Sequence, residues 1–154
     1  MESMFRSVCE MKKLLLLNGP NINMLGSREK TIYGADTLQQ IEKEVKDFGT
    51  SLDYQIDCFQ SNHEGELIDQ IHQAQNVYKG IVFNPAAYTH TSIALHDAIK
   101  AVDLPVIEVH LSNVHAREVY RHVSYTAPAC AGQIVGLGKQ GYVLAVQALH
   151  NILM

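Results

Sequence analysis

The chain has 154 residues, enough for one domain with a single core, and 47% of them are hydrophobic while 18% are charged. This balance is typical of a soluble globular protein, and no stretch approaches the roughly 18 consecutive apolar residues of a membrane helix. A net charge of -4 without clustered Lys and Arg argues against nucleic acid and membrane partners. A small molecule or another protein is therefore the expected partner.

The cysteines and the first residues indicate the compartment. Cys9, Cys58 and Cys130 are odd in number and lack CxxC spacing, which argues against a disulfide framework or a thiolate zinc site. A reducing cytoplasm is the expected location. Residues 1–10 lack the apolar core of a secretory signal, so we expect a flexible extension there and a single catalytic domain over residues 11–154.

The first predicted element is a buried strand at Leu14–Leu17, which the turn-forming residues 18–21 end. The loop that follows has no apolar periodicity, and loops of about a dozen residues inside compact domains usually have a function. Thr37 and Gln40 then match a capping box, which predicts the start of a helix, and Gly49 is expected to close that helix.

The middle of the chain alternates between strand and helix patterns. Tyr54–Cys58 predicts a half-buried strand near an edge, and the apolar residues among 67–74 predict a helix. Gly80–Phe83 predicts a central strand. A helix should follow it, capped by Thr89 or Thr91.

The last third contains two more strands and a terminal helix. Val106–Val109 and Gln133–Val135 predict the strands, with a polar and aromatic loop between them, and Tyr142–Leu153 predicts the helix. Five strands that alternate with helices indicate βαβ units and a parallel sheet. The expected fold is α/β, a flavodoxin-like three-layer sandwich with a five-stranded parallel sheet.

Polar side chains that could act on a ligand follow three of these strands. Ligands of open parallel sheets bind beyond the carboxyl ends of the strands, so these side chains should meet at one edge. Asn21, Arg28 and Tyr33 follow the first strand, Asn84 and His90 follow the third, and Glu108, His110, Ser112, Arg117 and Arg121 lie at the end of the fourth or after it.

Tyr33 and His110 are the candidates for acid and base chemistry. Arg28 near a phenol favours the phenolate, and a phenolate is a competent general base. Glu108 and His110 share a strand face, so the carboxylate can orient the imidazole, and Ser112 continues that face. Two alternatives stay open: Tyr33 can be a packed ring, and the Glu108–His110 pair can be a satisfied core pair.

The remaining candidates are more ambiguous. His90 and Asp97 are seven residues apart, which on one helix separates them by about 10 Å, too far to serve one site easily within a subunit. Asp97 alone would be a solvated helix residue. Arg117 and Arg121 would share a helical face and attract an anion, or would form surface salt bridges.

Two tempting motifs do not predict a cofactor or a metal. Residues 136–141 spell GxGxxG, but a dinucleotide site needs an acidic partner about 20 residues further on, and the sequence reaches only Met154. A tight turn is expected there instead. The histidines lack HExxH or Cys/His spacing, so we expect no metal and no cofactor.

The sequence contains three further motifs: LLLLNGPNINMLGSRE with IYG, FNPAAYTHTS, and EVHLSNVHAREVYRHVSY. They closely resemble motifs of type II 3-dehydroquinate dehydratases, and the resemblance extends from about Met11 to the end of the chain. The resemblance implies a hydro-lyase of the shikimate pathway and of aromatic amino acid biosynthesis. It would use no cofactor, dehydrate 3-dehydroquinate to 3-dehydroshikimate by anti elimination through an enolate, and assemble as a dodecamer of trimers.

The resemblance also implies a role for each matching residue. The catalytic positions are Tyr33 as proton acceptor, Arg28 as the loop arginine, Asn21 at the enolate, and His110, oriented by Glu108, as proton donor. The substrate positions are Asn84, Leu111 and Ser112 at the carboxylate, His90 and Arg121 at the ring hydroxyls, and Asp97 from a neighbouring subunit.

Two positions depart from the family pattern, since Lys30 stands where Pro is frequent and Ala86 where Gly is frequent. The alternative function is a non-catalytic domain of the same fold that binds a small carboxylate. A flavodoxin that binds FMN is a weaker third.

Overall fold

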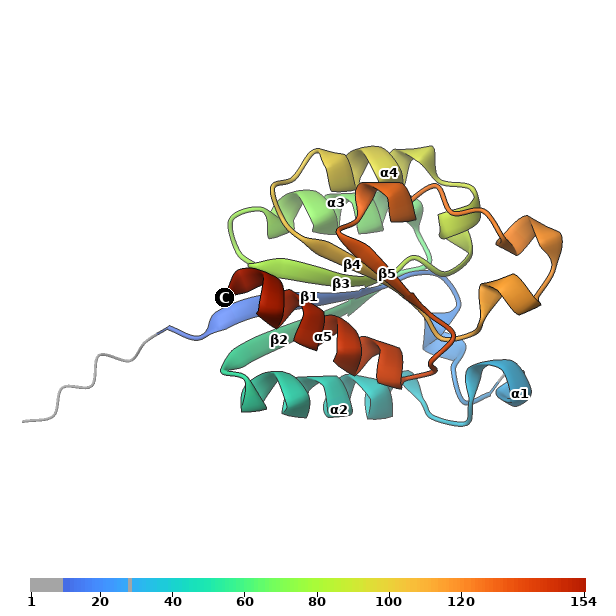
Figure 1. The fold of residues 1–154 in the computed structure, drawn as a ribbon, viewed down its shortest axis with the longest axis horizontal. Helices are drawn as coiled ribbons and strands as arrows, with labels where there is room; N and C mark the ends of the chain where they lie inside the picture. Colours follow the sequence, from blue (N-terminus) through green and yellow to red (C-terminus); the bar gives the residue numbers. More distant parts are fainter. Residues whose placement is uncertain (1–9, 28) are drawn as a thin grey trace, which may run out of the picture.

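The structure, a computed structural model, describes residues 10–27 and 29–154. Its strands form one sheet in the order β2-β1-β3-β4-β5 with every neighbouring pair parallel, as predicted (Figure 1). The strands are β1 (Lys12–Asn18), β2 (Tyr54–Gln60), β3 (Gly80–Asn84), β4 (Val106–His110) and β5 (Gly132–Val135). This strand order is that of the flavodoxin-like fold, with β2 at an edge and β3 at the centre.

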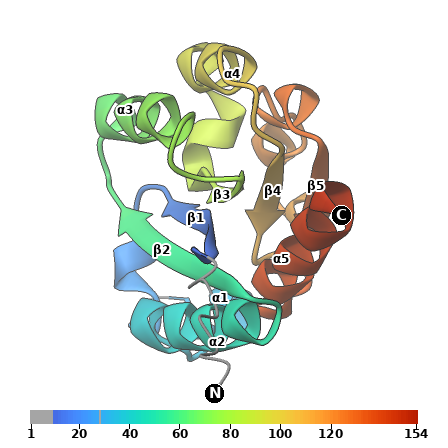
Figure 2. The same cartoon turned by 90° about the vertical axis from the view of Figure 1, so that its left-hand side faces the viewer.

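Helices cover both faces of the sheet (Figure 2). On one face lie α2 (Leu38–Ser51) and α5 (Gln140–Leu153), and on the other lie α3 (Glu64–Ala74) and α4 (Ile93–Lys100). Alternate leucines of β1 therefore enter different cores: Leu14 and Leu16 pack with α2 and α5, and their neighbours in the strand pack with α3 and α4. Burial on both faces explains why β1 is an unbroken apolar run.

The polar connections beyond the strand ends contain short helical turns that periodicity did not predict. One α-helical turn, α1 (Lys30–Tyr33), ends the loop after β1. Single 3-10 turns occupy Ile22–Met24, Ala86–His90, Val114–Ala116, Val119–Arg121 and Ala127–Ala129. The turns after β1, β3 and β4 carry Tyr33, His90 and Arg121 to the cleft at the carboxyl edge of the sheet.

Two predicted helix boundaries were wrong, for different reasons. The helix α2 starts at the predicted capping box, but it continues past Gly49 to Ser51. Glycine is favoured at position 49 for another reason: a Cβ there would lie 2.4 Å from Ile56 Cδ1. Ser92, and neither Thr89 nor Thr91, caps α4 by accepting a hydrogen bond from the Leu95 N–H at 2.9 Å.

The glycine motif of residues 136–141 is a tight turn between β5 and α5, as predicted. Gly136 has φ 87° and Gly138 has φ 59°, and a Cβ on Gly136 would lie 3.0 Å from Asn113 Cβ. Both positions therefore favour glycine for conformational reasons. Among the described residues, no helix is long and apolar enough to cross a membrane.

Candidate active site

A cleft opens at the carboxyl ends of β1, β3 and β4, as the strand order predicts. The space between its walls, open mouth included, is about 640 Å³. Most of the predicted site residues line this cleft together: Asn21, Tyr33, Asn84, His90, His110, Leu111, Ser112, Arg117 and Arg121.

The floor of the cleft rests on a buried chain of hydrogen bonds. The Ala86 N–H donates to Asn84 Oδ1 at 3.0 Å, so Asn84 Nδ2 must face the other way, and it donates to the Tyr142 hydroxyl at 2.8 Å. That hydroxyl donates to Asn18 Oδ1 at 2.6 Å. Burial raises the pKa of Tyr142, so the hydroxyl keeps its proton. A residue of α5 thereby fixes the orientation of Asn84.

Changing Tyr142 to Phe should lower the free energy of unfolding by about 2 to 3 kcal/mol, because it leaves buried amide groups of Asn84 and Asn18 without a partner. The matched control is Tyr54→Phe, whose hydroxyl makes one part-buried hydrogen bond to His150 at 3.0 Å and should cost about 1 kcal/mol. Urea unfolding measures both changes. Equal losses in the two variants would contradict a special role for Tyr142.

The loop that carries Asn21 is held by close backbone contacts. Gly19 N–H donates to Asn84 O at 2.7 Å, and a Cβ on Gly19 would lie 2.6 Å from Pro85 O, so only glycine allows this approach. Asn21 has φ 67° and donates its N–H to Asn62 Oδ1 at 3.0 Å. Together these contacts place the Asn21 side chain in the wall of the cleft.

Glu108 and His110 form a buried pair at the end of β4. His110 Nε2 lies 3.1 Å from Glu108 Oε2, and the Glu108 side chain is fully buried. Burial by itself raises the pKa of Glu108, but the hydrogen bond and charge of His110, with hydrogen bonds from Thr126 and Gln133, outweigh burial and bring the pKa below its usual value. Glu108 is therefore ionised, and it lies behind His110 rather than in the cleft wall.

His90 lies beside His110 on the cleft wall. The two rings stack with centroids 6.5 Å apart, and His90 Nδ1 donates to the Val123 carbonyl at 2.8 Å. Burial is the largest cause that lowers the pKa of His90, aided by the positive charges of His110 and Arg121. A neutral His90 with Nδ1 already engaged can offer Nε2 to a ligand.

Two cations lie close to Tyr33 in the cleft. The Arg117 guanidinium carbon lies 5.2 Å from the centroid of the Tyr33 ring. Burial by itself lowers the pKa of Arg121, but the charges of Glu118 and of the nearby Tyr33 side chain raise that pKa overall. Positive charge is therefore concentrated around the Tyr33 side chain.

Arg117 also connects Tyr33 to Ser112, because its Nη1 donates to Ser112 Oγ at 3.1 Å. Glu118 joins the two arginines, with its Oε2 at 3.8 Å from Arg117 Nε and at 2.7 Å from Arg121 Nε. The structure therefore combines both interpretations of the arginine pair, a salt bridge and a cationic side of the cleft.

Two predicted site residues are not among those lining the cleft, and a third cannot be placed. Asp97 is exposed on α4, whereas His90 belongs to the preceding 3-10 turn, so the assumption that one helix carries both was wrong. Glu108 is fully buried behind His110. Arg28 lies outside the described residues.

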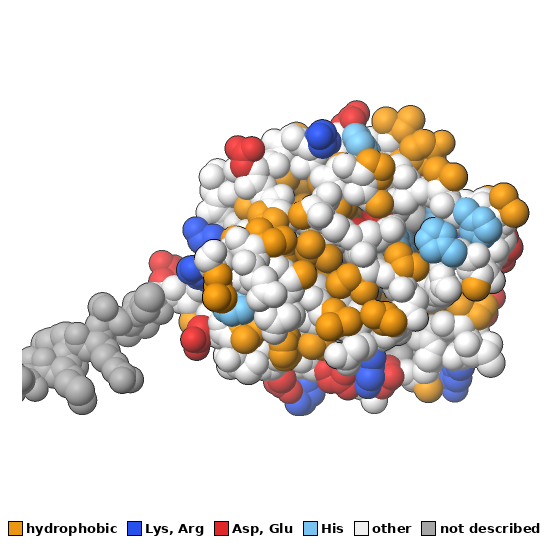
Figure 3. All heavy atoms as spheres, in the orientation of Figure 1, with side chains coloured by type: hydrophobic (Ala, Val, Ile, Leu, Met, Phe, Trp, Pro, Cys, Tyr) orange, Lys and Arg blue, Asp and Glu red, His pale blue; other side chains and the backbone are white. Residues whose placement is uncertain are grey.

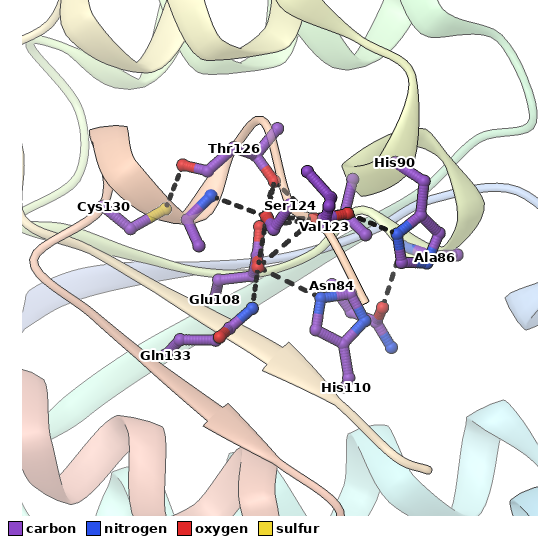
Figure 4. Close-up of polar contacts among 12 residues, drawn as sticks. Asn84, Ala86, His90, Glu108, His110, Val123, Ser124, Thr126, Cys130 and Gln133 are labelled. Carbon is purple, nitrogen blue, oxygen red and sulfur yellow. Dashed lines mark hydrogen bonds and ion pairs between the residues drawn. The ribbon is translucent and has the colours of Figure 1, made fainter. Parts of the chain in front are cut away.

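Several polar residues near the site were not among the predicted site residues. Only tertiary structure brings their side chains to Glu108 or Asn84, and Figure 4 shows the contacts around Glu108. They are Thr89, Ser124, Thr126, Gln133 and Tyr142.

The arrangement offers acid and base chemistry on a small anionic ligand. A phenol beside cations and an imidazole backed by a carboxylate line the same cleft. Within residues 10–27 and 29–154, no group of three or more His, Cys, Asp or Glu side chains is arranged to hold a metal ion.

Comparisons with known proteins agree with one another. The family model described as "Dehydroquinase class II" matches residues 12–150. A protein of Anoxybacillus flavithermus named 3-dehydroquinate dehydratase is 58% identical over 92% of this chain and 96% of its own, and one of Marinomonas sp. is 56% identical over 90% and 96%. A crystal structure of a type II dehydroquinase from Butyrivibrio crossotus superposes with a TM-score of 0.88 at 48% identity, covering 90% of this chain and 97% of its own.

Proposed function

This chain belongs to the class II dehydroquinase family, and from that premise we propose how the residues of its cleft divide the reaction. The chain is a hydro-lyase that dehydrates 3-dehydroquinate to 3-dehydroshikimate, a step of the shikimate pathway. The family assignment does not favour the alternative of a non-catalytic carboxylate-binding domain.

In the first step, Tyr33 acts as the base. Its phenolate removes a proton from C2 of 3-dehydroquinate, and the electrons of that C–H bond form the enolate with the C3 carbonyl. The Arg117 guanidinium over the Tyr33 ring supports this role because it places a positive charge beside the proposed base. Asn21, on the cleft wall, is suited to stabilise the enolate oxygen as charge develops there. Arg28 is proposed as a further cation on sequence grounds alone.

In the second step, His110 acts as the acid. The enolate electrons return to form the C1–C2 double bond, the C1–O bond breaks, and His110 gives its proton to the departing hydroxyl, which leaves as water. The observation that carries this proposal is the buried His110–Glu108 pair at 3.1 Å, at a cleft that the phenol and the arginines also line. Measuring C2 exchange and elimination separately in variants of Tyr33 and His110 tests the order of the steps.

The remaining residues of the cleft are proposed to hold the substrate. Asn84 on the floor, with Leu111 and Ser112 after β4, would bind the carboxylate. His90 and Arg121 would contact the ring hydroxyls, since the free His90 Nε2 accepts a hydrogen bond, the Arg121 guanidinium donates, and a hydroxyl can do both. Neither group of contacts requires a cofactor.

Asp97 is proposed to reach the cleft of a neighbouring subunit. Its side chain is exposed on α4, and two apolar side chains are exposed nearby. Ile93 of α4 is 63% exposed, and Tyr125, whose carbonyl accepts from His96 of α4 at 2.7 Å, is 46% exposed. Such a patch supports a contact between subunits. A separate apolar area lies over α5 and β5 (Figure 3), which supports a second contact of the kind that a dodecamer of trimers needs.

Coexpression of two inactive variants tests this assembly. A Tyr33→Phe chain still carries Asp97, and an Asp97→Ala chain still carries Tyr33. If Asp97 serves a neighbouring site, mixed oligomers contain some complete sites, so purified hetero-oligomers should regain on the order of a tenth or more of wild-type turnover. The separately purified variants are the control. Absence of regained activity in confirmed hetero-oligomers would contradict a shared site.

A reducing cytoplasmic location also remains a proposal. Cys58 and Cys130 are free thiols, which supports it. Burial is the main cause that raises the pKa of both thiols, and it brings that of Cys58 to about 12. Both therefore stay protonated and unreactive.

A further inference from the structure

Glu108 is surrounded by polar side chains that do not line the cleft of the proposed reaction. They come from the turn after β3, from the loop before β5 and from β5 itself, and they converge on one carboxylate (Figure 4). We call them the Glu108 cage: Thr89, Ser124, Thr126 and Gln133.

Contacts from the cage occupy both carboxylate oxygens. Gln133 Nε2 donates to Glu108 Oε2 at 2.5 Å, and the Thr126 hydroxyl donates to Oε1. The Thr89 hydroxyl lies 3.2 Å from Oε1, and the Ser124 hydroxyl lies 3.3 Å from Oε2. His110 Nε2 adds its own contact to Oε2.

The direction of these hydrogen bonds selects an ionised carboxylate. The Gln133 amide nitrogen can only donate, and the hydroxyl of Ser124 already accepts from the Ala127 N–H at 2.9 Å, which leaves its proton free to donate. An ionised carboxylate only accepts, whereas a protonated one would need a neighbour to reverse its role. Removing a donor therefore favours the protonated form.

The other titratable groups that face Glu108 stay neutral near pH 7. Burial is the main cause that lowers the pKa of His90 on one side, and burial, reinforced by Glu108, raises the pKa of Cys130 on the other. The cage therefore acts on the one proton that Glu108 and His110 can share.

We infer that Gln133 and Thr126 are positioning residues of the proposed elimination, which hold Glu108 ionised and directed at His110 Nε2 so that His110 carries the proton for the leaving hydroxyl. The inference rests on the proposed function. Neither residue lines the cleft, so each acts through Glu108 and not by contact with substrate.

Gln133→Leu and Thr126→Val test the inference by kcat and KM measured across pH. Both should lower kcat about ten- to a hundredfold at pH 8 with KM changed less than about twofold, because substrate contacts remain. Removing a donor shifts the proton that the pair shares from His110 toward Glu108, which lowers kcat. It also makes the pair as a whole bind that proton more tightly, so the alkaline limb of the kcat profile should move about one to two pH units higher.

The controls separate positioning from packing. Thr126→Ser keeps the hydroxyl and should restore the wild-type profile. Gln55→Leu removes a comparable amide-to-carboxylate bond, from Gln55 to Asp57 at 3.0 Å on β2, and should leave kcat unchanged. A wild-type profile in both test variants would overturn the inference. A loss of kcat that is equal at every pH, and that Thr126→Ser shows as well, would also overturn the inference.

Carbon-13 NMR of the Glu108 carboxyl separates failure of this inference from failure of the proposed function. Its titration midpoint should rise in Gln133→Leu and Thr126→Val relative to the wild type, whether or not the protein turns over 3-dehydroquinate. Unchanged midpoints in both variants would overturn the inference. A wild type that fails to dehydrate 3-dehydroquinate would overturn the proposed function alone.

Discussion

Tyr33→Phe should lower kcat for 3-dehydroquinate by about 10² to 10⁴-fold, which corresponds to about 3 to 5 kcal/mol of transition-state free energy. Phenylalanine keeps the ring under the Arg117 guanidinium and removes only the oxygen that takes the C2 proton. KM should change little, because the carboxylate and hydroxyl contacts remain. Steady-state ultraviolet assays of the enone product measure both constants.

Tyr120→Phe is the matched control for this change. The Arg121 guanidinium carbon lies 5.2 Å from the centroid of the Tyr120 ring, the same distance as in the Arg117–Tyr33 pair, but Tyr120 is 65% exposed and is not among the residues lining the cleft. It should keep wild-type kcat. If Tyr33→Phe also retained wild-type kcat, Tyr33 would not be the base.

His110→Asn should also lower the rate of elimination by about 10² to 10⁴-fold, but it should leave the first step active. In D₂O, this variant should exchange the C2 proton of 3-dehydroquinate for deuterium faster than it forms product, because Tyr33 still makes the enolate. Tyr33→Phe should show neither exchange nor elimination. NMR of recovered substrate measures the exchange.

His115→Asn is the control for the loss of an imidazole near the cleft, since His115 is exposed on the turn after β4. It should behave like the wild type in both measurements. Elimination at the wild-type rate in His110→Asn would contradict the proposed acid. Loss of both exchange and elimination would mean that His110 takes part in the first step.

Periodicity in the sequence predicts most of the fold because local patterns and burial agree there. The apolar run of β1 and the capping box at Thr37 need no tertiary information. The misplaced boundaries depend on such information: Gly49 is fixed by contact with Ile56, and Thr89 has its hydroxyl against Glu108 rather than at a helix start.

The candidate site likewise contains residues that could be predicted from the sequence and residues that could not. Residues that directly follow a strand, such as Asn84 and His110, could be predicted because the ends of parallel strands meet at one edge. Gln133 and Tyr142 could not, because their partners are far away in the sequence and no motif marks them. Support for a catalytic group is therefore harder to predict than the group itself.

We propose that this cleft eliminates water from 3-dehydroquinate by proton transfer between its own side chains. The most direct measurement adds 3-dehydroquinate to chelator-treated protein and follows the ultraviolet absorbance of the conjugated enone. We expect the absorbance to rise at the same rate with and without added divalent metal, and hardly at all with Tyr33→Phe. No rise, or a rise only after metal is added, would contradict it.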